Sequence, residues 1–215
     1  EEGLRLNRRS LRRWRPGDGD STHNRLTVND VIMLRNGGLA AATDAGVVLQ
    51  GANGRRSVVG RADGRPLSAA TSVAEDRDGR LWATSGSGFT GAAVGRNGRW
   101  SVARVSPLFD RANFHRIRPD HRGRLWFVGW VDPNLTRPGD AFEPGGVAFV
   151  LEGNRPVLFE PIRRLGVAKV YVVAEGPDGA LWFGTSAGIH RWLGDRWTTW
   201  SAAEGLRAAR TFALA

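Results

Sequence analysis

A Gly-x-Leu-Trp motif recurs three times along the chain, and this repeat limits the possible folds more than any other feature. The three copies end at Leu81-Trp82, Leu125-Trp126 and Leu181-Trp182, and a weaker copy without tryptophan ends at Leu39-Ala40. Successive leucines are 42, 44 and 56 residues apart, and the longest interval contains an insertion, residues 132–144. Without the insertion the period is about 43 residues, which is the length of one four-stranded β-propeller blade.

Each copy of the motif lies in the same arrangement of strand and turn signals. A glycine in the preceding turn, as at Asp78-Gly79 and Asp178-Gly179, permits the positive φ that a tight hairpin needs. A third strand then begins near a further glycine, and a second hairpin follows, as at Asn97-Gly98. No segment shows a sustained helical period. The sequence therefore predicts an all-β fold, a β-propeller with four recognisable four-stranded blades.

The expected domain organisation is one β-propeller domain or segment over residues 1–215, with partial blades at both ends. The expected parts are the last strands of a preceding blade (1–15), four blades (28–62, 70–107, 114–160 with the insertion, and 168–200), and the first strand of a next blade (208–215). The two ends can pair to close a small ring, or the chain can be an arc of a larger propeller. We favour the arc, because an open arc has sheet faces and edges that need neighbours.

Composition excludes several kinds of site. The chain has no cysteine, so disulfides and thiolate metal sites are excluded. No apolar run approaches the length of a membrane-spanning helix, so a membrane is expected only through parts outside this chain. The net charge is +10, with Lys169 as the only lysine among 31 basic residues, a skew typical of codon bias. An arginine cluster lies in residues 5–15 with only Trp14 beside it, so nucleic acid is not expected as a partner.

The motif tryptophans are predicted to be core residues. A leucine and a tryptophan at one equivalent place in every blade are what the stacking of neighbouring sheets requires, because each aromatic side chain buries a large area.

The sequence offers no catalytic or metal-binding pattern. The four histidines show no close ligand spacing, and Asp76-Arg-Asp78-Gly79 fails as a calcium loop because residue 87 is Ser rather than Glu. No nucleophile elbow or phosphate-cradling loop is present. We therefore predict no catalytic residue, no metal and no cofactor. His115 is a candidate binding residue, since it lies just before a first strand and first strands line a propeller channel.

The insertion of the third blade is the best candidate for a binding site. Loops after second strands share a propeller face with the connectors between blades, and long loops on a rigid scaffold commonly carry binding. Aromatic and polar side chains together suit sugars or other polar ligands. The candidate ligand-binding residues are Trp130, Asp132, Asn134, Arg137 and Phe142, with His115 and the connector residue Arg111. The alternative is a lid that packs on the blade, or a contact with a neighbouring domain.

Residues 174–189, which include Gly179-Ala-Leu-Trp182 and Gly184-Thr185, resemble the two-component regulator propeller repeat. The tail from Trp200 to Leu206 is similar to the link between blades in that family. The resemblance implies a periplasmic sensing module with a small-molecule or oligosaccharide ligand. It also implies partners outside this chain: adjoining domains or a partner subunit, and a histidine kinase or diguanylate cyclase as output.

Residues 176–183 also resemble a repeat of the streptogramin B lyases, which are propeller enzymes that use histidine and a divalent metal. The sequence thus favours a non-catalytic, extracytoplasmic ligand-sensing or interaction propeller of a bacterial two-component-type signalling protein. A lyase-like propeller enzyme and a protein-binding scaffold remain the alternatives.

Overall fold

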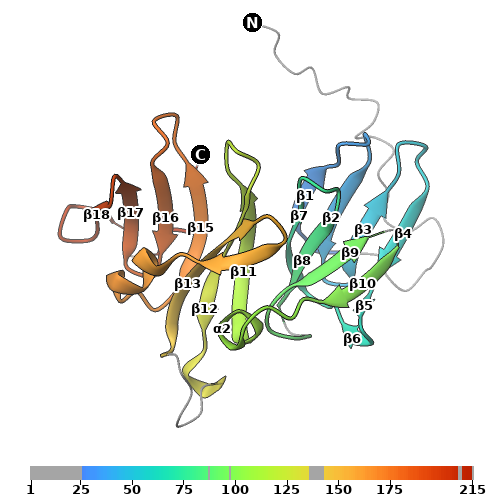
Figure 1. The fold of residues 1–215 in the computed structure, drawn as a ribbon, viewed down its shortest axis with the longest axis horizontal. Helices are drawn as coiled ribbons and strands as arrows, with labels where there is room; N and C mark the ends of the chain where they lie inside the picture. Colours follow the sequence, from blue (N-terminus) through green and yellow to red (C-terminus); the bar gives the residue numbers. More distant parts are fainter. Residues whose placement is uncertain (1–25, 87, 97, 136–142, 208–209, 215) are drawn as a thin grey trace, which may run out of the picture.

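The chain forms four four-stranded antiparallel sheets, each with its strands in sequence order (Figure 1). The computed structural model describes residues 26–86, 88–96, 98–135, 143–207 and 210–214. This up-and-down connection within every sheet is that of propeller blades, so the predicted all-β propeller class is confirmed. None of the described helices is long and apolar enough to span a membrane.

The strands follow the period that the motif predicts. The first blade contains β1 (Val28–Met33), β2 (Leu39–Thr43), β3 (Gly46–Gln50) and β4 (Arg56–Val59). The second contains β7 (Ala70–Glu75), β8 (Leu81–Ser85), β9 (Ala93–Arg96) and β10 (Arg99–Val102). The third contains β11 (Ala112–Pro119), β12 (Leu125–Val131), β13 (Gly145–Glu152) and β14 (Arg155–Leu158). The fourth contains β15 (Val170–Glu175), β16 (Leu181–Thr185), β17 (Gly188–Leu193) and β18 (Arg196–Trp200).

The connections between blades carry the remaining elements. A small hairpin of β5 (Arg61–Ala62) and β6 (Arg65–Pro66) links the first two blades. The helix α2 (Pro107–Arg111) precedes β11, and the 3-10 helices η1 (Pro133–Leu135) and η2 (Glu160–Leu165) follow β12 and β14. The sequence showed no helical period at α2 because the helix has only five residues. Its start is nevertheless capped, since the side chain of Ser106 accepts a hydrogen bond from the Phe109 amide.

The blades pack side by side through their first strands. β1 contacts β7, β7 contacts β11, and β11 contacts β15, so the sheets follow one another in Figure 1 from blue to red. Each blade has two ends. We call the end with the β1–β2, β7–β8, β11–β12 and β15–β16 turns the turn face, and the end with the connectors between blades the loop face. The insertion after β12 belongs to the loop face.

The expected partial blades lie mostly outside the described residues. Residues 1–15 are outside them entirely, and so are 208, 209 and 215. Residues 210–214 form no regular strand, although the Thr211 amide donates to the Thr185 carbonyl at the end of β16 (3.2 Å).

The hydrophobic core lies between adjacent blades. Trp82 belongs to the cluster between the second and third blades, where its ring meets Phe127 edge-on at 5.3 Å. Trp126 belongs to the next cluster, with Phe183. Both tryptophans are 3% exposed, which confirms them as core residues. The prediction is wrong for Trp182, which is only half-buried and stacks on Trp200, because no described blade covers that side of the fourth sheet.

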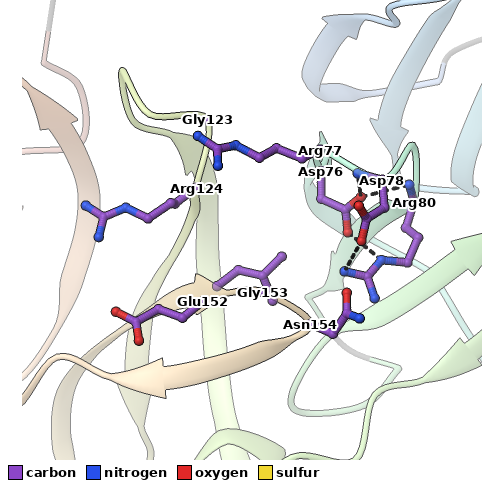
Figure 2. Close-up of a pocket in the computed structure, with 10 residues that line it drawn as sticks. Asp76, Arg77, Asp78, Arg80, Gly123, Arg124, Glu152, Gly153 and Asn154 are labelled. Atoms are coloured by element: carbon purple, nitrogen blue, oxygen red, sulfur yellow. Dashed lines mark hydrogen bonds and ion pairs between the residues drawn. The ribbon is translucent and has the colours of Figure 1, made fainter.

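In two blades an aspartate carboxylate accepts a hydrogen bond from the indole N–H of the motif tryptophan, an arrangement that we call the tryptophan clasp. Asp76 Oδ2 accepts hydrogen bonds from Arg80 Nε (2.6 Å) and Trp82 Nε1 (2.8 Å), while Oδ1 accepts from two backbone amides of the turn. Figure 2 shows Asp76 and Arg80 side by side at this turn. The same clasp recurs with Asp120, Arg124 and Trp126. The buried indole N–H therefore has a hydrogen-bond partner, and the same carboxylate also accepts hydrogen bonds from backbone amides of the turn.

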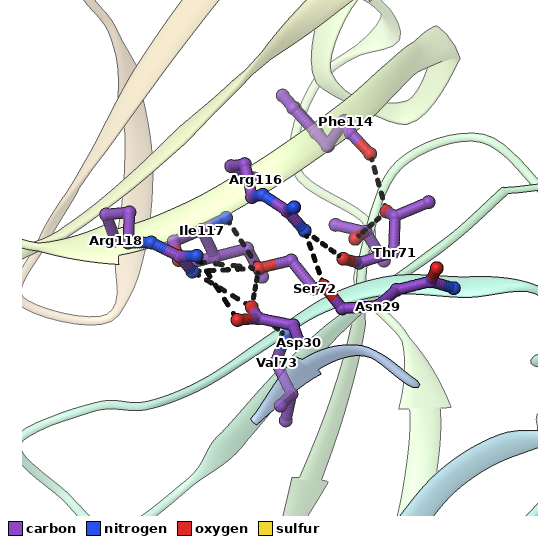
Figure 3. A network of polar contacts seen from close by, with 10 residues as sticks. Asn29, Asp30, Thr71, Ser72, Val73, Phe114, Arg116, Ile117 and Arg118 are labelled. Carbon is purple, nitrogen blue, oxygen red and sulfur yellow. Dashed lines mark hydrogen bonds and ion pairs between the residues drawn. The ribbon is translucent and has the colours of Figure 1, made fainter. Parts of the chain in front are cut away.

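A polar network ties the first strands of three blades together (Figure 3). Asp30 in β1 accepts hydrogen bonds from Ser72 Oγ in β7 (2.5 Å) and from Arg118 Nη1 in β11 (2.9 Å). Arg116 Nη1 reaches back across β7 to the Thr71 carbonyl (2.6 Å) and to a carbonyl of β1. These bonds join residues more than 40 positions apart and fix the first three blades relative to one another.

Candidate ligand-binding site

A cleft of about 630 Å³ opens on the loop face between the third and fourth blades. The ends of β12 and β13 form one wall, and the segment from η2 to β15 forms the other. Its lining includes Trp130, Asp132 and Glu143 from the insertion side, and Arg163 and Lys169 from the opposite side. The cleft therefore combines one aromatic ring with charges of both signs.

Trp130 is the centre of this site. It lies near the end of β12, where its backbone pairs with Asn113 and Gly146, and its side chain is half-buried. The ammonium of Lys169 lies over the indole ring, with Nζ 4.5 Å from the ring centroid, which is a cation–π contact. The pair fixes the orientation of a large flat surface at the cleft wall.

An aromatic cluster supports Trp130 from the first strands. The rings of His115 and Tyr171 lie 6.4 and 6.3 Å from the Trp130 ring, and 5.6 Å from each other, in edge-to-face arrangements. Phe212 contacts Tyr171 with a centroid distance of 4.4 Å. Such contacts hold the indole against β11 and β15, so a ligand on Trp130 meets a rigid wall.

Local hydrogen bonds fix both ends of the insertion. Asp132 Oδ1 accepts from the backbone amide of Asn134 (2.8 Å) and from its side-chain amide (2.9 Å). Arg163 Nη2 donates to the Glu143 carbonyl (2.7 Å), and its Nη1 donates to the Gly146 carbonyl (3.4 Å). Arg163 thus attaches the far end of the insertion to the connector between blades.

The structure brings some of the predicted residues together and not others. Trp130 and Asp132 line the cleft, Asn134 bonds to Asp132, and His115 packs on Trp130 from within β11 rather than from before the strand. Arg111, at the end of α2, is not among the residues that line the cleft. Arg137 and Phe142 lie outside the described residues.

Sequence reasoning missed Lys169, Tyr171 and Arg163. Two of them carried a signal, because Lys169 and Tyr171 are the only lysine and the only tyrosine of the chain and lie two positions apart. Arg163 carried none, since it is one arginine among many.

We expect the imidazole of His115 to titrate below its ordinary pKa. Burial lowers this pKa most, and the neighbouring positive charge of Arg116 lowers it further. Because the folded-state pKa is the lower one, His115 contributes stability that is fully present above pH of about 6.5 and is lost as the pH falls through the folded pKa. An NMR titration of the ring carbon resonances measures this directly. A midpoint for His115 at or above that of the unfolded chain contradicts the assignment.

The described residues contain no group of three histidine, aspartate or glutamate side chains close enough to hold a metal ion. His190 is 4% exposed and is held between the hydroxyls of Thr185 (3.1 Å) and Thr199 (3.0 Å). It therefore lies between strands of the fourth sheet, away from the cleft.

No protein-family model matches the sequence, and no curated protein matches it. Solved structures do. The extracellular domain of a hybrid two-component system of B. thetaiotaomicron gives a TM-score of 0.63 at 17% identity, over 86% of this chain and 24% of that chain. The extracellular domain of a one-component system of the same organism gives 0.62 at 13% identity, over 90% and 25%. A streptogramin B lyase structure gives 0.57 at 15% identity, over 85% and 56%.

The chain thus spans about a quarter of the two signalling domains and about half of the lyase. At these identities the similarity shows the fold, and the sensor and enzyme neighbours share it. The chain is a β-propeller segment with the fold found in extracellular domains of bacterial two-component systems.

Proposed function

We propose that the chain is an extracytoplasmic, non-catalytic ligand-binding module of a bacterial signalling protein of the two-component type, and that it binds its ligand in the loop-face cleft. The observation that carries this proposal is the convergence of Trp130 and Lys169 at a cleft of about 630 Å³ beside the longest insertion of the repeat. The fold shared with the extracellular signalling domains supports the location and the sensing role.

The chemistry of the cleft suits a small polar ligand such as an oligosaccharide. The indole offers an apolar face for stacking, and the charged groups around it offer hydrogen bonds of both polarities. Asp132 accepts hydrogen bonds, while Lys169 donates them. A cavity of this volume is within the range of small-molecule sites.

The position of the cleft also suits signal transmission. One wall belongs to the third blade and the other to the entrance of the fourth, so a ligand that contacts both changes the packing between two blades. A signal passed on in this way would reach adjoining domains or a partner subunit through blade contacts, with no chemical step in this chain.

We expect Trp130→Ala to weaken ligand binding while leaving the fold intact. The indole supplies the stacking surface, and its loss should weaken binding at least tenfold, equivalent to about 1.4 kcal/mol. The measurement is a thermal-shift screen of neutral and charged oligosaccharides and amino acids against the wild type, followed by calorimetry on those that raise Tm.

Lys169→Gln should weaken binding in the same assay, and Trp200→Ala is the matched control. Trp200 is also half-buried but stacks on Trp182 at the outer strand of the fourth blade. Wild-type affinity in both Trp130→Ala and Lys169→Gln would remove the cleft as the site. Recovery of chemically altered ligand after incubation with the wild type would contradict the non-catalytic role.

A further inference from the structure

A row of three arginines crosses the second blade at the turn face. Arg96 and Arg99 are direct partners across the β9–β10 pair. Leu81 pairs with Gly95 across the antiparallel β8–β9 pair. In the same register the preceding residue, Arg80, lies opposite Arg96. Adjacent strands lie about 4.8 Å apart, so the three residues occupy a row about 10 Å long. Like charges directly opposite each other destabilise a sheet, so the arrangement needs an explanation.

The other blades provide an internal comparison. Each has an arginine at the position of Arg99, where the fourth strand begins. The residues opposite these arginines are Gln50 for Arg56, Glu152 for Arg155, and Leu193 for Arg196. In the first blade the pair is hydrogen-bonded, with Arg56 Nε 3.0 Å from Gln50 Oε1. The scaffold therefore does not require a second arginine, and among the four described blades only the second has one.

These arginines line a groove of about 500 Å³ between the second blade and the β13–β14 turn of the third. Its lining also includes Arg104, Ser101 and Asn154, and no aspartate or glutamate among the residues that the structure describes. Arg96 and Arg99 are exposed, and neither makes an ion pair or hydrogen bond with another described side chain. Arg80 and Arg104 pair with Asp76 and Asp110, which do not line the groove, so its uncompensated positive charge belongs to Arg96 and Arg99.

Arg80 lies at the inner end of this groove, where a hydrogen bond to Asp76 positions its guanidinium. Its Nε is bound to Asp76, while its Nη2 is buried and donates no hydrogen bond within the described part of the chain. Nη2 is also in an ion pair with Asp78, whose Oδ2 lies 3.5 Å away. In Figure 2 the guanidinium of Arg80 lies beside Asn154 from the neighbouring blade. A buried N–H without a hydrogen bond is costly even within an ion pair, and an oxyanion in the groove would accept that hydrogen bond.

We propose that this turn-face groove binds a polyanion through phosphoryl or sulfuryl groups. Guanidinium groups match such oxyanions because their N–H donors form paired, charge-assisted hydrogen bonds. A row of charges about 5 Å apart fits a ligand with two or more anionic groups better than a single small ion. The Ser101 hydroxyl and the Asn154 amide add neutral donors at the groove. The arginine row lies at the turn-face end of the groove, which extends along β10 to Arg104, and the groove shares no lining residue with the Trp130 cleft.

The test uses the full chain, with tripolyphosphate and dextran sulfate as probes and neutral dextran as the blank, in calorimetric titrations at about 0.15 M salt, where the Debye length is about 8 Å. The double variant Arg96→Gln/Arg99→Gln should lose at least about 30-fold in affinity for the probe that binds. The control is Arg155→Gln/Arg196→Gln, which removes the same charge at the equivalent positions of the third and fourth blades. The control should stay within about threefold of the wild type, because distant exposed charges are screened.

A second measurement separates binding from folding. Without a probe, Arg96→Gln/Arg99→Gln should melt at the wild-type temperature or above it, because a like-charge contact has been removed. The probe should raise Tm of the wild type and of Trp130→Ala, and leave the double variant unchanged. Binding of one probe alone supports the site and assigns its anion as phosphoryl or sulfuryl. Equal losses in both double variants, or no binding of either probe, would overturn the proposal.

Discussion

Phe109→Ala is expected to lower the free energy of unfolding by about 3–5 kcal/mol, the range for truncating a buried aromatic side chain. Phe109 lies in α2 and is fully buried. Its ring meets those of Phe114, Phe127 and Phe149 at centroid distances of 4.7, 5.5 and 5.1 Å. The short connector helix thus supplies the centre of the core between the second and third blades, and its loss leaves a cavity that rigid sheets cannot close.

Urea denaturation followed by tryptophan fluorescence measures this change, and Tm should fall by about 10 °C. The control is Phe212→Ala, the same truncation at a side chain that is 53% exposed, where the loss should be less than about 1 kcal/mol. Similar losses at the two positions would show that α2 is not part of the core.

Asp120→Ala is expected to destabilise the chain by about 2–4 kcal/mol, because it leaves buried donors without a partner. Asp120 Oδ2 accepts from Arg124 Nε (2.7 Å) and from Trp126 Nε1 (3.2 Å), and Oδ1 accepts from the Arg124 amide (2.8 Å). The tryptophan is 3% exposed, so water cannot replace the lost acceptor. Both the turn and the indole orientation then lose their support.

The same residue sets a dependence on acid. Burial alone would raise the pKa of Asp120, but hydrogen bonds from Arg124 and Trp126 outweigh burial and hold the pKa below its ordinary value. The folded-state pKa is therefore the lower one. The stability that ionised Asp120 contributes to the folded chain is complete when the pH is above the ordinary aspartate pKa, and it is lost as the pH falls through the folded-state pKa. Asp120→Asn should flatten the decline of stability in acid.

The control for both measurements is Asp178→Asn, in the equivalent turn of the fourth blade. Asp178 is 49% exposed and pairs with Arg191 instead of clasping a tryptophan. We expect no measurable change in Tm for this variant. A loss at Asp178 as large as that at Asp120 would mean that the turn, and not the tryptophan clasp, is the stabilising unit.

The scaffold was predictable because its information is local. The period of about 43 residues and the Gly-x-Leu-Trp motif predict four blades, and each motif lies at the start of a second strand as expected. The sequence also contains a signal for the tryptophan clasp, because an aspartate lies six residues before the tryptophan in both blades, at Asp76 and Trp82 and at Asp120 and Trp126. Trp182 differs because Gly176 stands where the other two blades have the aspartate.

The sites were only partly predictable, because they form between blades. The insertion pointed to Trp130 and Asp132, but Lys169 reaches the indole from a segment 39 residues later in the chain. The arginine row requires the register of three strands, and its exposure requires that no acidic side chain of the third blade enters the groove. Side-chain periodicity predicts only which face of its own strand a residue occupies, and not which other strand or blade lies beside that face.

The sequence by itself determined the repeating blade, its turns and the core position of two motif tryptophans, because these depend on neighbours within one hairpin or on a pattern repeated in every blade. Only the tertiary structure decided which connectors meet at the cleft, which arginines share a groove, and that Asp30, Ser72 and Arg118 join three blades. The physical reason is that these contacts depend on how sheets stack, and stacking brings together residues of different blades that lie about 40 or more positions apart in the chain.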